Sequence, residues 1–347
     1  MFFFILFYKK YSNTFCKPGK RKSGKKENLE KKKPGKMLFL ENAFLTSNNI
    51  MKGTNKKKRR NLKKTAKQLN CSPLVKNKKV VSNSCMTSDV LLKIRDEYNK
   101  DHDKKIVATK PALIWHELRM KLDTKDERKW VNEIDDPKLR AQIKKQLFAP
   151  ESPPEWLKNP NEWLTNYDID MVMEQYEMEN KDFKYLGTTP IDYDYIVDTK
   201  SHTCVEDDLC KFNLKEQMSH GKRRFASVFN LDKHDQSGSH WVSVFIDVNK
   251  RIIMFFDSAS GPVPKKITEF VNSVKEQGLK QNIVFKYIAG KKRHQSGGTE
   301  CGVYSIHFII QMLTQPDKAM QIFLYGKIPD KEVEKYRKIY FNEPENV

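Results

Sequence analysis

The stretch RHQSGGTECGVYSIHFI, residues 293–309, joins a polar loop rich in glycine to a segment that is almost entirely apolar. Between residues 301 and 314 the apolar side chains fall on every side of a helical wheel, which is typical of a helix buried in a core. Cys301 would be the first residue of this helix. The helix dipole and the backbone N–H groups of a first turn lower the pKa of a thiol placed there. The stretch therefore predicts a core helix with a reactive cysteine at its N-terminus.

Short strands are expected on the N-terminal side of this helix. Runs of β-branched and aromatic residues bounded by turn residues predict strands, and amphipathic stretches predict helices. The expected strands span residues 225–231, 242–248, 252–256 and 283–288, and the expected helices span residues 264–277 and 330–341. Strands flanked by helices along the chain indicate an α+β domain. We assign this domain to residues 222–347.

The preceding region, residues 81–221, has mainly helical periodicity. We expect helices with Ser88 as N-cap, with Pro111 in a first turn and with Thr124 and Glu127 as a capping box. Two more helices are expected over residues 138–148 and 168–178. The region carries no obvious catalytic motif. Its expected role as a mostly helical subdomain is packing or holding a substrate.

The net charge of +21 is carried by one end of the chain. Residues 1–80 hold 24 Lys and Arg against three Asp and Glu, whereas the remaining residues hold equal numbers of both signs. This balance excludes a protein whose folded body is one broad cationic surface for nucleic acid. Because residues 9–80 have few aromatic side chains between their lysine runs, we expect residues 1–80 to form a disordered basic arm.

Two functions are open for this arm. Its Lys and Arg clusters can bind nucleic acid or another acidic partner by releasing counterions. Alternatively, the arm is a solvated tail that keeps the protein soluble or directs it to a compartment. The apolar run over residues 1–8 is far shorter than the ~20 residues that span a bilayer. It also lacks the features of a signal peptide, so we expect a soluble protein without a membrane span.

The six cysteines include no C-x-x-C pair. A secreted disulfide scaffold is much denser in cysteine, so a reducing compartment is expected. Cys204 and Cys210 offer an alternative interpretation as zinc ligands together with nearby histidines. These histidines would be His202 and His220, but the spacing fits no common zinc pattern.

Four polar residues stand in a suggestive order along the predicted α+β domain. His240 opens an expected strand and Asp257 ends the next one, while Gln295 and Cys301 enclose the glycine-rich loop. A cysteine nucleophile needs a base, a group that orients the base, and donors for the oxyanion. His240 would be the base, and Asp257 would hold its ring in the correct tautomer. Gln295 would donate its amide to the oxyanion beside the backbone N–H of Cys301.

Two other histidines are weaker candidates for the base. His294 follows no strand and adjoins Gln295, so we expect it to pack or hydrogen-bond locally. His234 lies in a polar loop, residues 233–238, where a surface position is expected.

The ordered set resembles the Ulp-type, SUMO-protease-like cysteine peptidases, which are similar to the adenovirus protease. Their chain order is His, Asp or Glu, Gln and Cys, whereas papain-like enzymes place Cys first. The likeness is strongest to the polyprotein-processing proteases of African swine fever virus and giant DNA viruses. It covers residues 222–341 strongly and residues 85–221 more weakly. It rests on HWVSVFIDV (240–248), FFDSASGPVP (255–264), RHQSGGTECGVYSIHFI (293–309), KIPDKEVEKYRKIYF (327–341) and, upstream, WLTNYDIDMVMEQYE (163–177).

The resemblance implies an Ulp/adenain-like fold, with a central mixed sheet flanked by helices. It implies a monomeric cysteine endopeptidase that needs no cofactor. His240, Asp257 and Cys301 would form its triad, and Gln295 would complete the oxyanion hole. The orienting residue is Asn in the swine fever virus member and Asp257 here, which agrees with the Ulp-type pattern.

The resemblance also implies a substrate and a location. The substrates would be viral structural polyproteins, cleaved after Gly-Gly during virion maturation. The enzyme would reside in the virion and in host cytoplasm at assembly sites. Trp241, Gly297 and Gly298 would wall a narrow slot that admits only residues without a side chain before the scissile bond.

Two alternatives remain open. One is a deconjugating protease that acts on ubiquitin- or SUMO-like proteins, whose tails also end in Gly-Gly. The other is a non-enzymatic, basic-armed nucleic-acid-binding core protein built on the same fold. The complete set of four site residues argues against this last interpretation.

Overall fold

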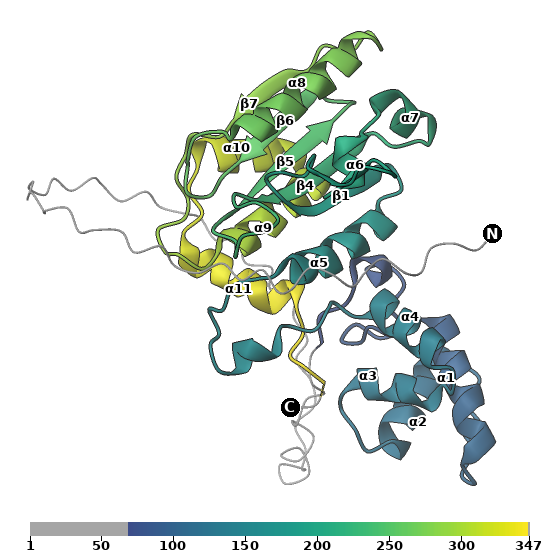
Figure 1. Ribbon diagram of the computed structural model, residues 1–347. Coiled ribbons are helices and arrows are strands. Elements are labelled where there is room, and N and C mark those ends of the chain that lie inside the picture. Colours follow the sequence, from purple (N-terminus) through teal and green to yellow (C-terminus); the bar gives the residue numbers. More distant parts are fainter. Residues whose placement is uncertain (1–68, 346–347) are drawn as a thin grey trace, which may run out of the picture. The chain divides into compact units, whose positions relative to one another are not determined.

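The computed structural model describes residues 69–345, which contain a five-stranded sheet (Figure 1). Its strands are β1 (Phe183–Pro190), β4 (Arg224–Asn230), β5 (Trp241–Asp247), β6 (Ile252–Phe256) and β7 (Lys286–Ala289), in the spatial order β1-β4-β5-β6-β7. The three central strands pair antiparallel, whereas the edge strands β1 and β7 run parallel to their neighbours. The sheet is therefore mixed, which confirms the predicted α+β class.

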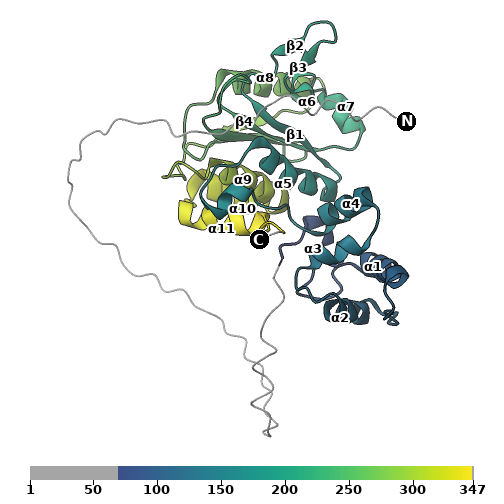
Figure 2. The same ribbon diagram turned by 60° about the horizontal axis from the view of Figure 1, so that its bottom comes forward.

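Helices cover both faces of this sheet, and Figure 2 shows them as layers on either side of it. The helices of this part are α5 (Asn166–Glu179), α6 (Asp207–Cys210), α7 (Leu214–Ser219), α8 (Lys265–Leu279), α9 (Cys301–Thr314), α10 (Pro316–Tyr325) and α11 (Asp330–Tyr340). Helix α9 packs on β5, and α5, α10 and α11 surround it on the same face. Helices α7 and α8 pack on the opposite face. Nearly every residue of α9 is buried, which confirms the predicted core helix.

The side chains of β5 explain why both faces are covered. Every residue of this strand is buried. Successive side chains of a strand point to opposite faces. Trp241 and Phe245 accordingly pack with α9, whereas Val242, Val244 and Ile246 pack with α8. A strand that is apolar on both faces is stable only between two layers, and the sequence supplies both.

A second core lies in the helical part of the chain. It is formed by α1 (Ser88–Asp101), α2 (Pro111–Lys121), α3 (Glu127–Trp130) and α4 (Pro137–Leu147). The bond donated by Gln175 Nε2 to the Phe148 carbonyl (2.8 Å) ties the end of α4 to α5. Residues 69–80, which we assigned to the arm, also pack here, since Val75 is buried and Asn70 donates its backbone N–H to Asn342 Oδ1 (2.7 Å).

Some local predictions were wrong. Strand β1 was not predicted, because Gly187 and Pro190 interrupt its apolar pattern and its partner β4 is distant in sequence. The capping box of Thr124 and Glu127 does not form. Asp126 caps α3 instead, and the Glu127 carboxylate accepts a bond from the Trp115 indole at 2.6 Å. Helix α10 and the small hairpin of β2 (Ile196–Asp198) and β3 (Thr203–Cys204) were also not predicted.

No helix within residues 69–345 is long and apolar enough to cross a membrane. Residues 1–68 lie outside the described residues, and they include the apolar run over residues 1–8 and most of the predicted arm.

Candidate active site

His240 and Asp257 meet at one end of the sheet because β5 and β6 are antiparallel. His240 immediately precedes β5 and Asp257 immediately follows β6. Ser243 near the start of β5 is paired with Phe256 at the end of β6, which places the two flanking residues side by side. The His240 Nε2 atom lies 2.6 Å from Asp257 Oδ1. The predicted base and its orienting residue are therefore in contact.

The Asp257 carboxylate is held by backbone donors as well as by the histidine. Ala259 donates its N–H to Oδ1 at 2.8 Å, and Gly261 donates its N–H to Oδ2 at 2.5 Å. Only 3% of the Asp257 side chain is exposed. A buried carboxylate with its oxygens saturated in this way keeps one orientation, so it fixes the ring of His240.

Cys301 is the first residue of α9, and its side chain contacts His240. Its side chain is buried, and it remains a thiol while other described cysteines form disulfides. The Cys301 sulfur interacts with the His240 ring through a hydrogen bond. Since Nε2 of the ring is bonded to Asp257, the nitrogen that faces Cys301 is Nδ1. The structure thus brings the three predicted triad residues together in one chain of contacts.

Gly302 lets α9 approach the start of β5 closely. A Cβ added to Gly302 would lie 3.1 Å from Leu164 and 3.3 Å from the Trp241 ring. The Trp241 indole is itself fixed, because its Nε1 donates to the Leu164 carbonyl at 3.1 Å. The Cys301-Gly302 sequence therefore places the thiol close to Trp241, the residue that follows the candidate base His240.

The electrostatics of the site favour a charged His240. Burial opposes the charged ring and by itself lowers the pKa. Hydrogen bonds to Asp257 and Cys301, with the charges of those groups, outweigh burial and raise the pKa of His240 to about 10. Burial similarly raises the pKa of Asp257, but the bond and charge of His240 and two backbone N–H groups lower it below its ordinary value. The site is arranged for an imidazolium between a carboxylate and a thiolate.

Gln295 is buried and has a fixed amide orientation. The Ser258 hydroxyl donates to Gln295 Oε1 at 2.7 Å, and the Gln295 backbone N–H donates to the Ser258 carbonyl at 2.8 Å. With its oxygen turned to Ser258, the amide presents its Nε2 donor on the other side. Ser258 directly follows Asp257, so one dipeptide supports both the base and the oxyanion candidate. Sequence reasoning did not assign this role to Ser258.

The prediction for His294 is confirmed, whereas His234 is half-buried and not at the surface as we expected. His294 is fully buried, with Nε2 3.0 Å from the Phe323 carbonyl and Nδ1 accepting the Ile328 N–H at 3.1 Å. Both ring nitrogens are engaged in local structure, so His294 is not available as a base. His234 Nδ1 lies 2.7 Å from Asp192 Oδ2.

The glycine-rich loop before α9 is anchored by α11. Asp330 accepts the backbone N–H groups of Ser296 and Gly297 at 3.0 and 2.7 Å, and it also accepts the Tyr304 hydroxyl at 3.0 Å. Gly298 is exposed, and a Cβ added there would meet no atom within 4 Å. Trp241 packs against Gly302, the residue after Cys301, whereas Gly297 and Gly298 are exposed in this loop. The substrate-binding role of these three residues stays a prediction.

A buried ion pair holds the residue before the nucleophile. Arg337 of α11 donates its Nε to Glu300 at 2.8 Å and an Nη to the Thr299 carbonyl at 3.0 Å. Both side chains of this pair are at most 5% exposed. Breaking a buried pair leaves an uncompensated charge, so this contact locks the backbone that leads into Cys301. Its partners are far apart in sequence, and no local motif could have revealed it.

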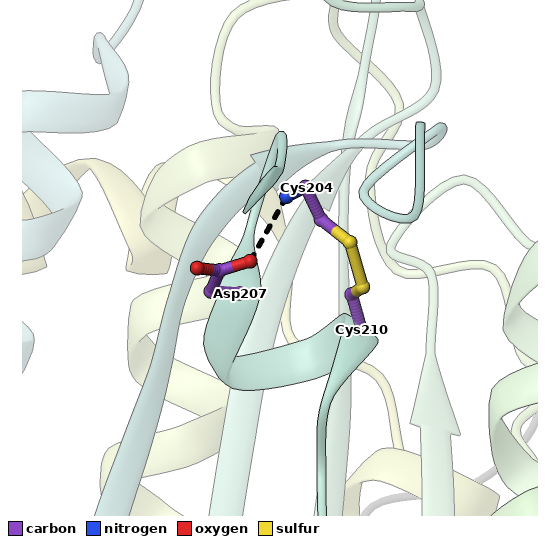
Figure 3. A group of neighbouring side chains, drawn as sticks. All are labelled: Cys204, Asp207 and Cys210. Atoms are coloured by element: carbon purple, nitrogen blue, oxygen red, sulfur yellow. Dashed lines mark hydrogen bonds between the residues drawn. A yellow bond between two sulfur atoms is a disulfide. The ribbon is translucent and has the colours of Figure 1, made fainter. Parts of the chain in front are cut away.

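The zinc interpretation of the cysteines does not describe this structure. Cys204 and Cys210 are disulfide-bonded, and Asp207 lies beside them with its carboxylate accepting the Cys204 N–H at 2.9 Å (Figure 3). Among the described residues, neither His202 nor His220 joins this group.

A second disulfide joins Cys71 and Cys85. We expected these four cysteines to be reduced, whereas the structure joins them in two disulfides. Neither pair could be predicted from the sequence, because its cysteines show none of the spacing or density of a disulfide scaffold.

The raised pKa of His240 makes a direct prediction for the charge state of the ring. Because the folded-state pKa is about 10 against an ordinary 6.5, the ring should stay protonated at neutral pH and lose its charge only as the pH rises through about 10. The ion pair contributes its full stabilisation of the folded state below pH 6.5. This stabilisation is lost as the pH rises from 6.5 through about 10. Side-chain NMR of labelled histidine measures the titration, and Asp257→Asn should move it toward 6.5. A wild-type midpoint near 6.5 would contradict the ion pair.

Comparison with known proteins agrees with this geometry. Residues 228–346 match the family model described as the Ulp1 protease family, C-terminal catalytic domain, and residues 155–283 match that of the vaccinia virus I7 processing peptidase. A protein of Acanthamoeba polyphaga mimivirus that carries the name thiol protease R355 is 34% identical over 190 residues, which cover 53% of this chain and 58% of the relative. The cysteine protease S273R of African swine fever virus is 27% identical over 191 residues, covering 52% of this chain and 68% of the relative.

A solved structure shares the fold. The crystal structure of the African swine fever virus pS273R protease matches 81% of this chain and 98% of its own chain, with a TM-score of 0.54 and 21% identity. The family match includes His240, Asp257, Gln295 and Cys301. Residues 228–346 of this chain are therefore similar to the catalytic domain of the Ulp1 protease family, and the chain spans just over half the length of the mimivirus relative.

Proposed function

We propose that this chain is a cysteine endopeptidase in which Cys301 is the nucleophile, His240 the acid and base, and Asp257 the orienting residue. The observation that carries the proposal is the contact chain of Asp257, His240 and Cys301 at the N-terminus of a buried helix. The matched protease family supports the same assignment. Gln295 and the Cys301 backbone N–H would stabilise the oxyanion.

The chemistry follows from the charges of the site. The Cys301 thiolate attacks the carbonyl carbon of the scissile bond, and the carbonyl oxygen becomes an oxyanion. The His240 imidazolium gives its Nδ1 proton to the leaving amine, which leaves a thioester on Cys301. Neutral His240 then takes a proton from water as the water attacks the thioester. The acid product leaves, and the thiolate–imidazolium pair is restored.

We further propose that the substrates are viral structural polyproteins cleaved after Gly-Gly during virion maturation, in the virion and at assembly sites. The viral relatives support this substrate class. The proposed slot would have Trp241, next to the proposed base, on one side and Gly297 and Gly298, in the loop before the proposed nucleophile, on the other. A substrate residue with a Cβ next to the scissile bond would meet these walls.

Peptides that vary the two glycines test the substrate rule. Replacing either Gly by Ala should slow cleavage about 10–200-fold, since a small pocket rejects one methyl group by about that factor. The measurement is kcat/KM for Gly-Gly-Xaa, Ala-Gly-Xaa and Gly-Ala-Xaa peptides. Equal rates on all three would refute the narrow slot.

One observation favours a second candidate function. Swine fever virus relatives carry the name SUMO-1 cysteine protease, which suggests deconjugation of a ubiquitin-like protein. A deconjugase draws affinity from the folded body of its substrate, so an intact ubiquitin-like fusion should be strongly preferred over any peptide. A polyprotein protease should cleave a short extended peptide equally well.

The basic arm is proposed to bind nucleic acid. A chain that starts at residue 69 loses 21 of the 65 Lys and Arg residues and keeps the contacts of Asn70 and Val75. It should cleave short peptides at the full rate and lose salt-sensitive binding to DNA or RNA. Fluorescence anisotropy at two salt concentrations measures the binding. Equal affinity with and without residues 1–68 would show that the folded body binds nucleic acid itself.

A further inference from the structure

A cavity of about 560 Å³ lies beside the active site. Its walls come from α5, from β1 and from the segment that leads through β3 into α6, and Trp241 closes one end. Trp241 directly follows His240 and lies against the Cys301-Gly302 backbone. A substrate chain that leaves the nucleophile past Trp241 would therefore enter this cavity.

The cavity is lined by more acids than bases. Six of its residues carry carboxylates: Asp170, Glu174, Glu177, Glu206, Asp207 and Asp208. Four of these are close to a lysine. Lys184 lies 2.7 Å from Asp208 and 3.9 Å from Glu177, and the ion pairs of Glu174 and Asp207 are formed with Lys145 and Lys211.

Asp170 forms no ion pair in the part of the chain that the structure describes. Glu206 forms none either, although the charge of Lys184 acts on it. Asp170 lies on α5, and Glu206 is the N-cap residue of α6. The two carboxyl groups are close enough for the charge of Asp170 to raise the pKa of Glu206. Burial raises the pKa of each carboxyl to about 7. A cation between them would add a positive charge to those of Lys184 and Lys233, which also line the cavity and are fewer than its six carboxylates.

Unpartnered polar atoms point independently to a missing ligand. Within residues 69–345, the buried side-chain atoms without a hydrogen-bond partner include Asp170 Oδ1 and Thr189 Oγ1. Both residues line this one cavity, and Thr189 is only 1% exposed. Buried polar groups are normally paired. A carboxylate oxygen and a hydroxyl are suitable acceptors for a ligand that donates several hydrogen bonds.

We propose that the cavity binds a lysine or arginine side chain of the substrate, close to the scissile bond. An ammonium or guanidinium group offers three to five donors and one positive charge. It would satisfy Asp170, Glu206 and Thr189 together. The adjacency to Trp241 places this residue within about four positions of the cut, since an extended chain advances about 3.3 Å per residue. The inference rests on the proposed peptidase function and adds a specificity to it.

Peptides that all contain Gly-Gly before the cut test the proposal. Each carries Lys, Arg, Gln or Glu at one position within four residues on either side. At one position, Lys or Arg should raise kcat/KM about 10- to 100-fold over Glu, as expected for hydrogen bonds to a charged group. The double variant Asp170→Asn with Glu206→Gln should reduce this preference below about threefold, as the ratio of kcat/KM for Lys and Glu peptides measured on the same variant. Glu276→Gln, an exposed change on α8, should leave the preference intact.

The two proposals fail in different ways. Equal rates for Lys and Glu at every position, on peptides that are cleaved, overturn the cavity proposal alone. If no Gly-Gly peptide is cleaved, the proposed peptidase specificity fails instead. Calorimetric titration of the same peptides then tests whether the cavity binds a basic side chain. Tighter binding of a Lys or Arg peptide that disappears in the double variant supports it, and equal binding of Lys and Glu peptides overturns it.

Discussion

Replacing Cys301 by Ala, or His240 by Ala, should reduce peptide cleavage to background, a loss on the order of 10⁴- to 10⁶-fold in kcat. The structure gives the reason. Cys301 is the proposed nucleophile, and His240 is the residue that both contacts it and is hydrogen-bonded to Asp257. Because the two residues act as one unit, the double variant should be hardly slower than either single one. Cleavage of a Gly-Gly peptide with purified variants measures this.

The controls separate catalysis from folding. His102→Ala removes a histidine that is also paired with a carboxylate, Glu133 at 2.9 Å, but on a surface of the helical part. This variant should keep full activity. Asp257→Asn should be less damaging than Asp257→Ala, because an amide still orients the ring. Unchanged melting temperatures show that each variant is folded. Near-normal turnover by Cys301→Ala would rule out the proposed nucleophile.

The parts of the fold that the sequence predicted are those with a local cause. The apolar run from residue 301 to residue 314 favours a buried helix, and the paired strands β5 and β6 are rich in β-branched and aromatic residues. The site could be predicted for the same reason. His240, Asp257 and Cys301 each lie at an element boundary that short-range patterns define.

The remaining features depend on contacts between distant residues. Strand β1 pairs with β4 about forty residues away. The Asp330 carboxylate holds a loop 34 residues upstream, and Arg337 reaches Glu300 across 37 residues. A side chain that acts at such a distance leaves no periodic signal in the sequence. The predicted capping box shows that a local motif can also mislead. Glu127 fits the motif, but its carboxylate is buried and accepts a hydrogen bond from the Trp115 indole.

Replacing Gln295 by Ala should lower kcat about 10²–10³-fold and leave KM nearly unchanged, as expected when one oxyanion donor is removed. The amide is well placed for this function. The Ser258 hydroxyl holds its oxygen at 2.7 Å, which turns the Nε2 donor away from Ser258 without any rearrangement during the reaction. Gln295→Glu keeps the size but puts an acceptor and a negative charge where the oxyanion develops, so it should be at least as slow as Gln295→Ala.

Ser258→Ala provides the decisive comparison for Gln295. It leaves the amide in place but removes the group that orients it, so kcat should fall by about tenfold, much less than in Gln295→Ala. A structural role for Gln295 makes a different prediction, because both variants would then lower the melting temperature and raise KM together. A raised KM with unchanged kcat in Gln295→Ala would make this residue a substrate-binding group. The oxyanion would then depend on backbone donors alone, of which the N–H of Cys301 at the start of α9 is the first candidate.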